Sequence, residues 1–232
     1  MSAIAKSIRI AVGDAGRVSA VLQTPPSPRA CYVLAHGAGA GMNHRFMADV
    51  AREVASRGLA TLRYQFPYME HGSKRPDPPH LAQATVRAAV AAALDLLPGL
   101  PLIAGGKSFG GRMTSQAQAI APLPEVRGLA FLGFPLHPAG SPSQIRAEHL
   151  FEIKIPMIFL QGTRDTLASL DQLKPVCKKL GRRATLKLLD DADHSFHVPA
   201  RTGRKDAQVL EEALDELAAW LDSVIGQRRK TT

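Results

Sequence analysis

One short glycine-rich segment constrains the fold of this chain more than any other feature. Gly106-Lys107-Ser108-Phe109-Gly110 follows the apolar run Leu102–Ala104 and precedes a helical pattern over Met113–Ile120. The G-x-S-x-G spacing is typical of a sharp strand-to-helix turn that presents a nucleophilic serine, because the tight backbone excludes side chains two positions away. The amides at the start of the following helix would face developing negative charge.

Two other interpretations of this segment remain open from its own residues. The first is a plain glycine-rich connection in which Ser108 caps the helix. The second is a phosphate-binding loop, whose motif would end in Gly106-Lys107-Ser108. That loop needs a glycine five residues before Gly106, where Pro101 stands, so the phosphate-binding interpretation is disfavoured.

Length and composition indicate a globular chain. A chain of 232 residues fits one domain with a substantial core, so we expect a single domain over residues 1–232, with a basic tail from about residue 227. Met1–Asp14 lacks the apolar core of a signal peptide, and Ala88–Leu97 is too short to cross a bilayer. These features predict a cytoplasmic protein with no membrane partner.

The net charge of +9 raises the question of nucleic-acid binding, but the basic residues are scattered and aromatic residues make up only 5% of the chain. A solvated basic surface is therefore favoured, and no nucleic-acid partner is expected. Two cysteines, Cys31 and Cys177, suggest neither a disulfide framework nor a metal-binding pair. We expect no metal and no cofactor.

Strand-like and helical patterns alternate along most of the chain, which predicts a mostly parallel sheet with helices on both faces. The runs Ser7–Val12 and Arg17–Leu22 predict an antiparallel hairpin at its edge. The segment between Leu132 and Met157 is too short for a large cap domain. Further strands are expected over Cys31–Ala35, Leu59–Arg63, Leu102–Ala104, Val126–Leu132, Met157–Leu160 and Ala184–Leu189, and loops over Gln65–His80 and Gly133–Ser143.

Three candidate catalytic residues follow separate strands of this predicted sheet. Ser108, Asp165 and His194 each come after a strand and occur in the order nucleophile, acid, base. Because the carboxyl ends of parallel strands share one edge, these side chains can converge there. A serine needs a general base, and that histidine needs a carboxylate on its other nitrogen, so the set predicts nucleophilic catalysis.

Each member of this set has competitors in the sequence. Asp165 could be a turn residue or a helix cap. Asp193 is adjacent to His194 and its side chain would point elsewhere, while Asp190 and Asp191 fit turn positions. His36 fits a bracing role before a glycine-rich loop. The remaining alternatives to His194 are His71, His137 and His197.

The backbone around the predicted serine turn should also contribute to the site. We expect the N–H groups of Phe109 and Ala38 to form an oxyanion hole, since one such donor usually follows the nucleophile and another lies in an earlier loop. Lys107 and Arg112 flank the serine, and the two cations would either attract an anionic acyl group or pair with surface carboxylates. The expected substrate-binding residues are Gly37, Gly39, Phe66, Tyr68, Lys107, Phe134 and His137.

These segments resemble the α/β-hydrolase family, in its small, cap-less, dienelactone-hydrolase-like group. They are most similar to a branch of testis-expressed hydrolase-like proteins and the hydrolase-like subunit of a nuclear histone acetyltransferase complex. The resemblance implies the α/β-hydrolase fold and carries the triad onto Ser108, Asp165 and His194. Dienelactone hydrolases use a cysteine nucleophile where this chain has Ser108, so their substrate is not transferred. The matching segments are His36–Gly39, Phe66–Tyr68, Gly105–Arg112, Phe134–Pro138, Gly162–Asp165 and Asp193–Phe196.

The functional hypothesis is a serine hydrolase, of carboxylesterase or thioesterase type, that cleaves a small ester, thioester or related acyl bond. Its partner would be a small acyl substrate, with an anionic one favoured if the flanking cations bind it. The rival hypothesis is a non-catalytic interaction module that kept the fold, as in assembly subunits of the similar branch. Neither the natural substrate nor the oligomeric state follows from the sequence.

Overall fold

The computed structural model describes residues 3–226, so the basic tail expected from about residue 227 lies outside the described residues. One sheet of eight strands runs through this part of the chain, in the order β1-β2-β4-β3-β5-β6-β7-β8. The strands are β1 (Ile4–Ala11), β2 (Arg17–Thr24), β3 (Ala30–Ala35), β4 (Leu59–Tyr64), β5 (Leu102–Lys107), β6 (Val126–Leu132), β7 (Met157–Gly162) and β8 (Ala184–Leu189).

The strand directions agree with the prediction of a mostly parallel sheet with an antiparallel hairpin at its edge. The strands from β4 to β8 in this order are mutually parallel, whereas β2 runs antiparallel to both β1 and β4. The N-terminal hairpin therefore forms the antiparallel edge. The helices are α1 (Arg45–Ser56), α2 (Pro67–Glu70), α3 (Pro79–Leu96), α4 (Phe109–Ile120), α5 (Leu170–Leu180) and α6 (Asp206–Gly226), with 3₁₀ segments η1 (Gly13–Ala15), η2 (Ile145–Glu152), η3 (Gly181–Arg183) and η4 (Ala200–Thr202).

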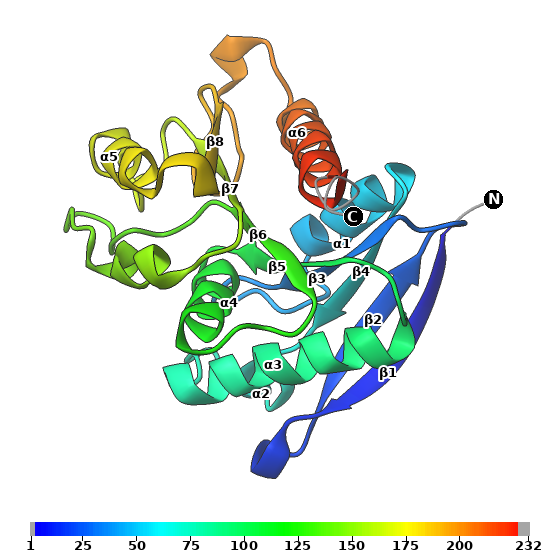
Figure 1. Cartoon of the computed structure of the whole chain (residues 1–232). Helices are drawn as coiled ribbons and strands as arrows, with labels where there is room; N and C mark the ends of the chain where they lie inside the picture. Colours follow the sequence, from blue (N-terminus) through cyan, green and yellow to red (C-terminus); the bar gives the residue numbers. More distant parts are fainter. Residues whose placement is uncertain (1–2, 227–232) are drawn as a thin grey trace.

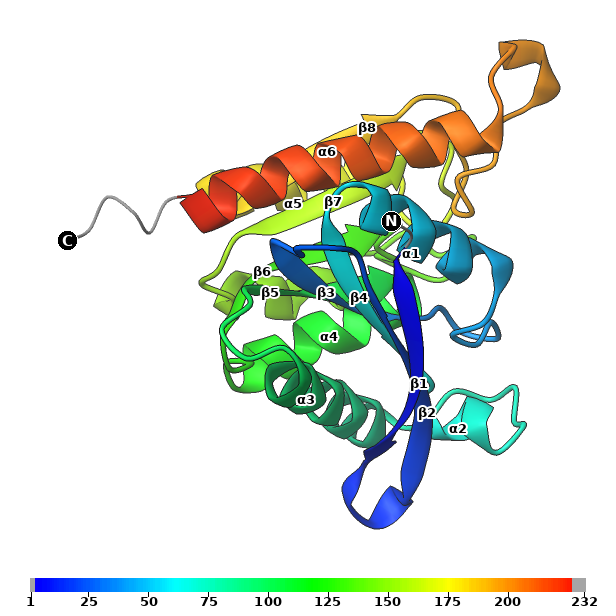
Figure 2. The ribbon, with the colours of Figure 1, turned by 90° about the vertical axis from the view of Figure 1, so that its right-hand side faces the viewer.

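Helices cover both faces of the sheet (Figure 1), as the alternating pattern predicts. Side chains alternate across a strand, so β3 sends Cys31 and Val33 to one core cluster and Tyr32 and Leu34 to the other. Helices α3, α4 and α5 pack on the first face, and α1 and α6 pack on the second. Figure 2 shows α6 lying along the sheet beside α1.

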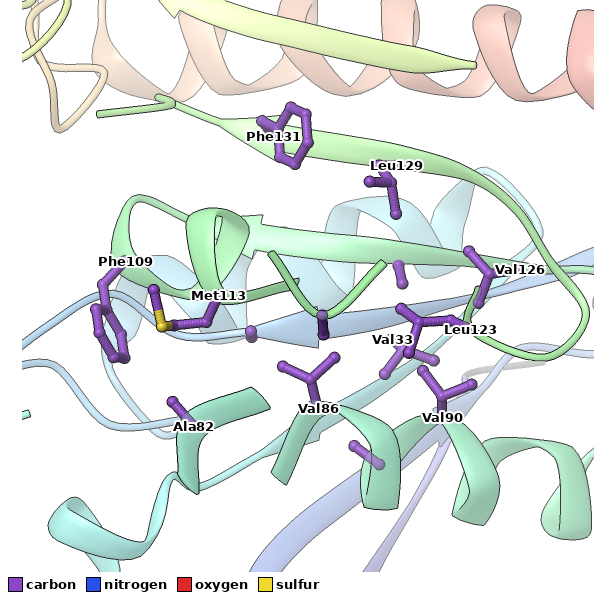
Figure 3. Packing of buried hydrophobic residues seen from close by; sticks show 14 of the residues in the cluster. Val33, Ala82, Val86, Val90, Phe109, Met113, Leu123, Val126, Leu129 and Phe131 are labelled. Carbon is purple, nitrogen blue, oxygen red and sulfur yellow. The ribbon is translucent and has the colours of Figure 1, made fainter. Parts of the chain in front are cut away.

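Small and branched apolar residues of α3 and β3 form part of the core on the α3–α4 face. Figure 3 shows Val86 and Val90 of α3 pointing toward Val33 of β3, while Met113 of α4 lies nearer the start of α3. All four side chains are at most 1% exposed. Because α4 is held against both the sheet and α3, the turn that precedes it is fixed in position.

Helix α2 lies where the sequence predicts a loop, and the 3₁₀ segment η2 follows the predicted loop Gly133–Ser143. Helix α2 starts at Pro67, which suits a first helical turn because proline lacks only an N–H that would be unbonded there. Segment η2 lies in the stretch after β6 and buries Ala147 and Leu150. Both elements are too short to show a clear helical periodicity in the sequence. Within residues 3–226, none of the helices is both long and apolar enough to cross a bilayer.

The predicted serine turn is tighter than expected. Strand β5 continues to Lys107 rather than ending at Ala104, and α4 begins at Phe109, directly after the serine. The strand continues because Gly105 and Gly106 pair with both β3 and β6. Ser108 is therefore the single residue between strand and helix.

Candidate active site

Ser108 occupies a strained backbone conformation at the junction of β5 and α4. Its φ of 49° and ψ of −114° lie in a region that residues with a Cβ rarely adopt. Such strain persists where the surroundings enforce it, and it often marks functional positions. Here the extended β5 and the packed α4 enforce the turn.

Glycine is required on both sides of Ser108 by the neighbouring strand β3. A Cβ on Gly106 would lie 2.1 Å from the carbonyl oxygen of Ala35, and one on Gly110 would lie 2.5 Å from that of His36. Both distances are far below any real contact. The tight backbone of the turn is the reason for these glycines that the sequence suggests, but the clashing atoms belong to the strand end beside the turn.

Ser108, His194 and Asp165 form one continuous chain of hydrogen bonds. Ser108 Oγ lies 2.8 Å from His194 Nε2, and His194 Nδ1 lies 2.6 Å from Asp165 Oδ2. Because the carboxylate only accepts, Nδ1 carries the proton and Nε2 is free to accept from the serine hydroxyl. The structure thus brings together the three side chains that the sequence predicts would converge.

Asp165 is held in place by further donors. Its side chain is fully buried, and it accepts hydrogen bonds from Gln161 Nε2 at 2.5 Å and from the Leu167 N–H at 2.8 Å. Gln161 also accepts from the Phe134 N–H at 2.8 Å, so it links the end of β6 to the acid. Sequence reasoning missed Gln161. Its signal is a polar residue that ends the apolar run of β7.

The competing acids and histidines do not take these positions. Asp193 points into its own loop, where its Oδ1 accepts from the N–H groups of Ser195 and His197. His197 pairs with Asp206 at the start of α6. Asp191 adopts a positive φ of 58°, in keeping with a turn position.

The two N–H groups that are expected to form the oxyanion hole belong to backbone that does not use them in secondary structure. Phe109 is the first residue of α4, where an N–H has no partner within the helix. Ala38 lies in the exposed loop after β3. Among the described residues, neither N–H meets a hydrogen-bond acceptor, so both can bind an oxygen of a substrate.

His36 braces the loop that carries Ala38. The ring is fully buried, its Nε2 accepts from the Phe66 N–H at 3.1 Å, and its Nδ1 donates to the Gly37 carbonyl at 2.8 Å. This arrangement requires a neutral imidazole. Burial lowers the pKa of His36 to about 4.

Acid should destabilise the fold through His36. Its folded pKa is about 4 against 6.5 for the unfolded residue, so between these values only the unfolded chain binds the proton. Stability from this group is therefore complete above pH 6.5 and is lost as the pH falls to 4, by about 3 kcal/mol. Urea unfolding of native protein and His36→Gln across this range measures it, because glutamine keeps an acceptor but does not titrate.

The exposed His80 supplies a matched control for this measurement. His80→Gln should keep the acid-dependent loss of stability seen in the native protein, while His36→Gln should show a shallower dependence on pH. Equal pH dependence in the native protein and in His36→Gln would contradict the assignment.

Lys107 contacts the catalytic-site loop rather than open space. Its Nζ donates to the backbone carbonyl of His194 and lies 5.9 Å and 5.5 Å from the ring centres of Phe46 and Phe196. Burial lowers the pKa of this amine to about 8, against the opposing effect of Asp165 and Asp193. The charged group of Lys107 is thus engaged with the loop that carries His194, and the expectation that it binds substrate stays a prediction.

Lys107→Met should lower kcat about tenfold with little change in KM. Methionine keeps the apolar stem but loses one charged hydrogen bond that holds the His194 loop, and such a bond is worth about that factor. Steady-state kinetics on a small ester tests this, with Lys187→Met on the distant strand β8 as the control. A rise in KM at constant kcat would instead indicate direct substrate binding.

Several predicted substrate-binding side chains are buried. Phe66 and Phe134 are 0% exposed and belong to the core on the α3–α4 face, so the expectation that they line an open site is wrong. Phe66 packs edge-on against His36 and Phe109. Tyr68 is 4% exposed, and its hydroxyl accepts from the Gly39 N–H at 3.3 Å. Phe66 and Tyr68 therefore support the loop after β3 that carries Ala38.

The other two expected residues of the set differ from each other. His137 is 2% exposed, its Nδ1 contacts the carbonyl of Pro138, and its Nε2 has no partner. Gly37 is buried against Lys107 and Ser108, where a Cβ would lie 3.8 Å from the serine Cβ. Gly37 thus lies directly beside Ser108. Over residues 3–226, no three histidine, cysteine or acidic side chains are grouped as a metal site.

Comparisons with known proteins agree with this architecture. A family model described as an alpha/beta hydrolase domain matches residues 28–222. The structure is similar to a dienelactone hydrolase from Anabaena variabilis, with a TM-score of 0.74 and 19% identity over 98% of this chain and 99% of the other. It is also similar to XC6422 from Xanthomonas campestris, described as a serine hydrolase without a lid, with a TM-score of 0.70 and 19% identity over 92% and 94%.

A third similar structure is P91, a dienelactone hydrolase-like promiscuous phosphotriesterase from metagenomic libraries. Its TM-score is 0.70, and its identity is 18% over 97% of this chain and 99% of the other. At this identity the structural matches establish the fold, whereas the family model covers most of the sequence itself. The chain belongs to the alpha/beta hydrolase domain family.

Proposed function

We propose that this protein is a serine hydrolase that cleaves a small ester or thioester through an acyl-enzyme. The observation that carries the proposal is the 2.8 Å contact between Ser108 Oγ and His194 Nε2, with Asp165 on the other side of the ring. A nucleophile within hydrogen-bond reach of an oriented base is the arrangement that this chemistry needs.

The reaction follows from the positions of these groups. Ser108 Oγ attacks the substrate carbonyl carbon while its proton passes to His194 Nε2, and Asp165 stabilises the resulting imidazolium. The N–H groups of Phe109 and Ala38 hold the negative oxygen. The imidazolium then protonates the leaving alcohol or thiol. Finally, a water activated by His194 breaks the acyl–Ser108 bond and releases the carboxylic acid.

Asp165→Asn should lower kcat by about 10⁴-fold while the protein stays folded. An asparagine in this place can present its amide nitrogen to His194 Nδ1, which favours the tautomer that cannot accept the serine proton. Asp193→Asn is the matched control, since its carboxylate bonds only to its own loop. Nearly equal kcat values for the native protein and Asp165→Asn would contradict the proposed role.

A panel of chromogenic acyl esters and thioesters, varied in chain length and charge, tests the proposed activity. Hydrolysis that disappears in Ser108→Ala supports it, and the preferred members separate an esterase from a thioesterase. The exposed loop at Ala38 and the short segment after β6 favour small substrates over long acyl chains.

The second candidate function is a non-catalytic interaction module, which the resemblance to a histone acetyltransferase subunit favours. The fully buried Asp165 and its Gln161 partner argue against it, because a binding module has no need to maintain an oriented base. A folded native protein that hydrolyses none of the panel would support the module. Salt-sensitive retention on DNA or RNA would indicate a nucleic-acid partner instead.

A further inference from the structure

Among the described residues, two arginines on α4 and η2 have neither a carboxylate nor a carbonyl oxygen to accept hydrogen bonds from their guanidinium groups. Arg112 of α4 and Arg146 of η2 are both half-buried, and in the described part of the chain neither guanidinium meets a carboxylate or a carbonyl. The Nε of Arg112 is buried without any partner. Such a group costs free energy unless something supplies the missing acceptor.

The contrast with the other half-buried arginines makes this pair unusual. Each of the others within residues 3–226 donates to an oxygen: Arg29 to Asp222, Arg57 to Asp215, Arg87 to Ala121, Arg127 to Glu125, Arg183 to Phe151 and Arg204 to Glu212. The protein thus supplies acceptors to its half-buried guanidinium groups everywhere except at Arg112 and Arg146.

The two arginines add positive potential to each other's surroundings, and among the described residues neither is paired with a carboxylate. Burial and the charge of Arg146 lower the pKa of Arg112. Burial and the charge of Arg112 lower the pKa of the neighbouring His149 to about 4, so that ring stays neutral. His149 Nε2 bonds to Ser115 Oγ at 2.7 Å, which fixes η2 against α4. Two like charges held together in this way favour a bound anion.

Arg112, the member of the pair on α4, lies beside the proposed reaction centre. The Arg112 N–H donates to the Ser108 carbonyl at 3.0 Å, so the two residues are one turn apart on the same side of α4. The Arg112 guanidinium carbon lies 6.0 Å from the ring centre of Phe109, whose N–H is a proposed oxyanion donor. An anion held by Arg112 would therefore belong to the molecule that Ser108 attacks.

We infer that Arg112 and Arg146 bind a carboxylate of the substrate, and that the natural substrates are small esters or thioesters carrying a carboxylate near the scissile bond. This inference rests on the proposed hydrolase function. Guanidinium groups suit a carboxylate because their paired N–H donors match its two oxygens. The carboxylate then accepts from N–H groups of the two half-buried guanidiniums, which donate to no carboxylate or carbonyl among the described residues.

The kinetic test compares substrates that differ only in charge. The phenyl monoester of glutaric acid is paired with phenyl pentanoate, and the acetyl ester of 3-hydroxybenzoate with phenyl acetate. If the glutarate monoester is preferred over phenyl pentanoate, the substrate carboxylate lies on the acyl side. If the acetyl ester of 3-hydroxybenzoate is preferred over phenyl acetate, the carboxylate lies on the leaving group. Either preference should fall by roughly 10–100-fold in Arg112→Met and in Arg146→Met.

The control is Arg127→Met. Arg127 is also half-buried, but it pairs with Glu125 and lies near the N-terminal end of β6, away from the carboxyl ends of the strands where the proposed site lies. This variant should keep the native charge preference. In Arg112→Met, the kcat/KM for the anionic esters should fall by more than the kcat/KM for the neutral esters, because the lost contact touches only the anionic substrates. An unchanged ratio of anionic to neutral kcat/KM in both Arg112→Met and Arg146→Met would overturn the inference.

Binding without turnover separates this inference from the proposed function. Glutarate should raise the unfolding midpoint of the native protein by about 2–4 °C relative to sodium chloride of equal ionic strength, and not that of Arg112→Met. That shift in a protein that hydrolyses no ester would keep the anion site and reject the hydrolase. Hydrolysis with neither the shift nor a charge preference would keep the hydrolase and reject the anion site.

Discussion

Replacing Ser108 with alanine should lower kcat for any hydrolysed ester by about 10⁴–10⁶-fold, the largest effect expected from one side chain in this protein. The hydroxyl supplies the attacking oxygen, and no other hydroxyl lies on the hydrogen-bonded chain from His194 to Asp165 in the described structure. The residual rate would come from the oxyanion donors and from substrate binding, which the substitution leaves in place.

The effects of two substitutions on kcat do not add when both residues serve the same step, so a double variant tests whether Ser108 and His194 act together. Because Ser108 and His194 act on the same proton, the double variant Ser108→Ala/His194→Ala should be no slower than Ser108→Ala alone. Ser195→Ala, an exposed serine in the same loop as His194, should keep the native kcat. Losses that multiply in the double variant, or a Ser108→Ala protein with more than a tenth of native kcat, would contradict the assignment.

Gly106→Ala should destabilise the protein by more than about 4 kcal/mol, because it places a methyl group 2.1 Å from the carbonyl oxygen of Ala35. Gly106 also has a φ of 146°, which residues with a Cβ rarely adopt. The neighbouring atom is strand backbone in the middle of the sheet, so it cannot move aside as a flexible side chain would. We expect little soluble protein, and a large fall in the unfolding midpoint of what is obtained.

Gly226→Ala serves as the control for that experiment. A Cβ at Gly226 would meet nothing within 4 Å, so this substitution should leave the unfolding midpoint nearly unchanged. An unfolding midpoint for Gly106→Ala within a few degrees of the native value would show that the strand end can shift, and that the serine turn is less rigid than described here.

Much of the fold is predictable because its long elements carry their own signals. Strand β6 and strand β8 have the bounds that the sequence predicts. Each is a mostly apolar run that can be recognised from the local sequence. The short elements α2 and η2 are stabilised by burial against distant residues, and no local pattern reports that.

The convergence of Ser108, Asp165 and His194 is predictable for a related reason. Parallel strands bring their carboxyl ends to one edge, so residues far apart in the chain can be assigned to one site. What lies around that site depends on side-chain directions. Lys107 turns toward the His194 carbonyl, and Phe134 turns into the core, although both are adjacent in sequence to exposed loops or to the nucleophile. Spacing alone does not determine those directions.

Arg112 shows a further limit of sequence reasoning. Its position one turn after Ser108 predicts a shared face, but a lone arginine in a sequence gives no sign of whether a carboxylate will meet it. The structure supplies that information through the absence of an acceptor among the described residues and the proximity of Arg146.

Covalent labelling with a fluorophosphonate, read by intact-mass and peptide-mass analysis, tests the central claim most directly. The reagent forms a bond only with a serine whose proton is removed by a positioned base. We expect one adduct on Ser108 in the native protein, strongly slowed labelling in His194→Ala, and none in Ser108→Ala. A folded native protein that stays unlabelled under conditions that label a known serine hydrolase, or an adduct on another residue, would contradict the account.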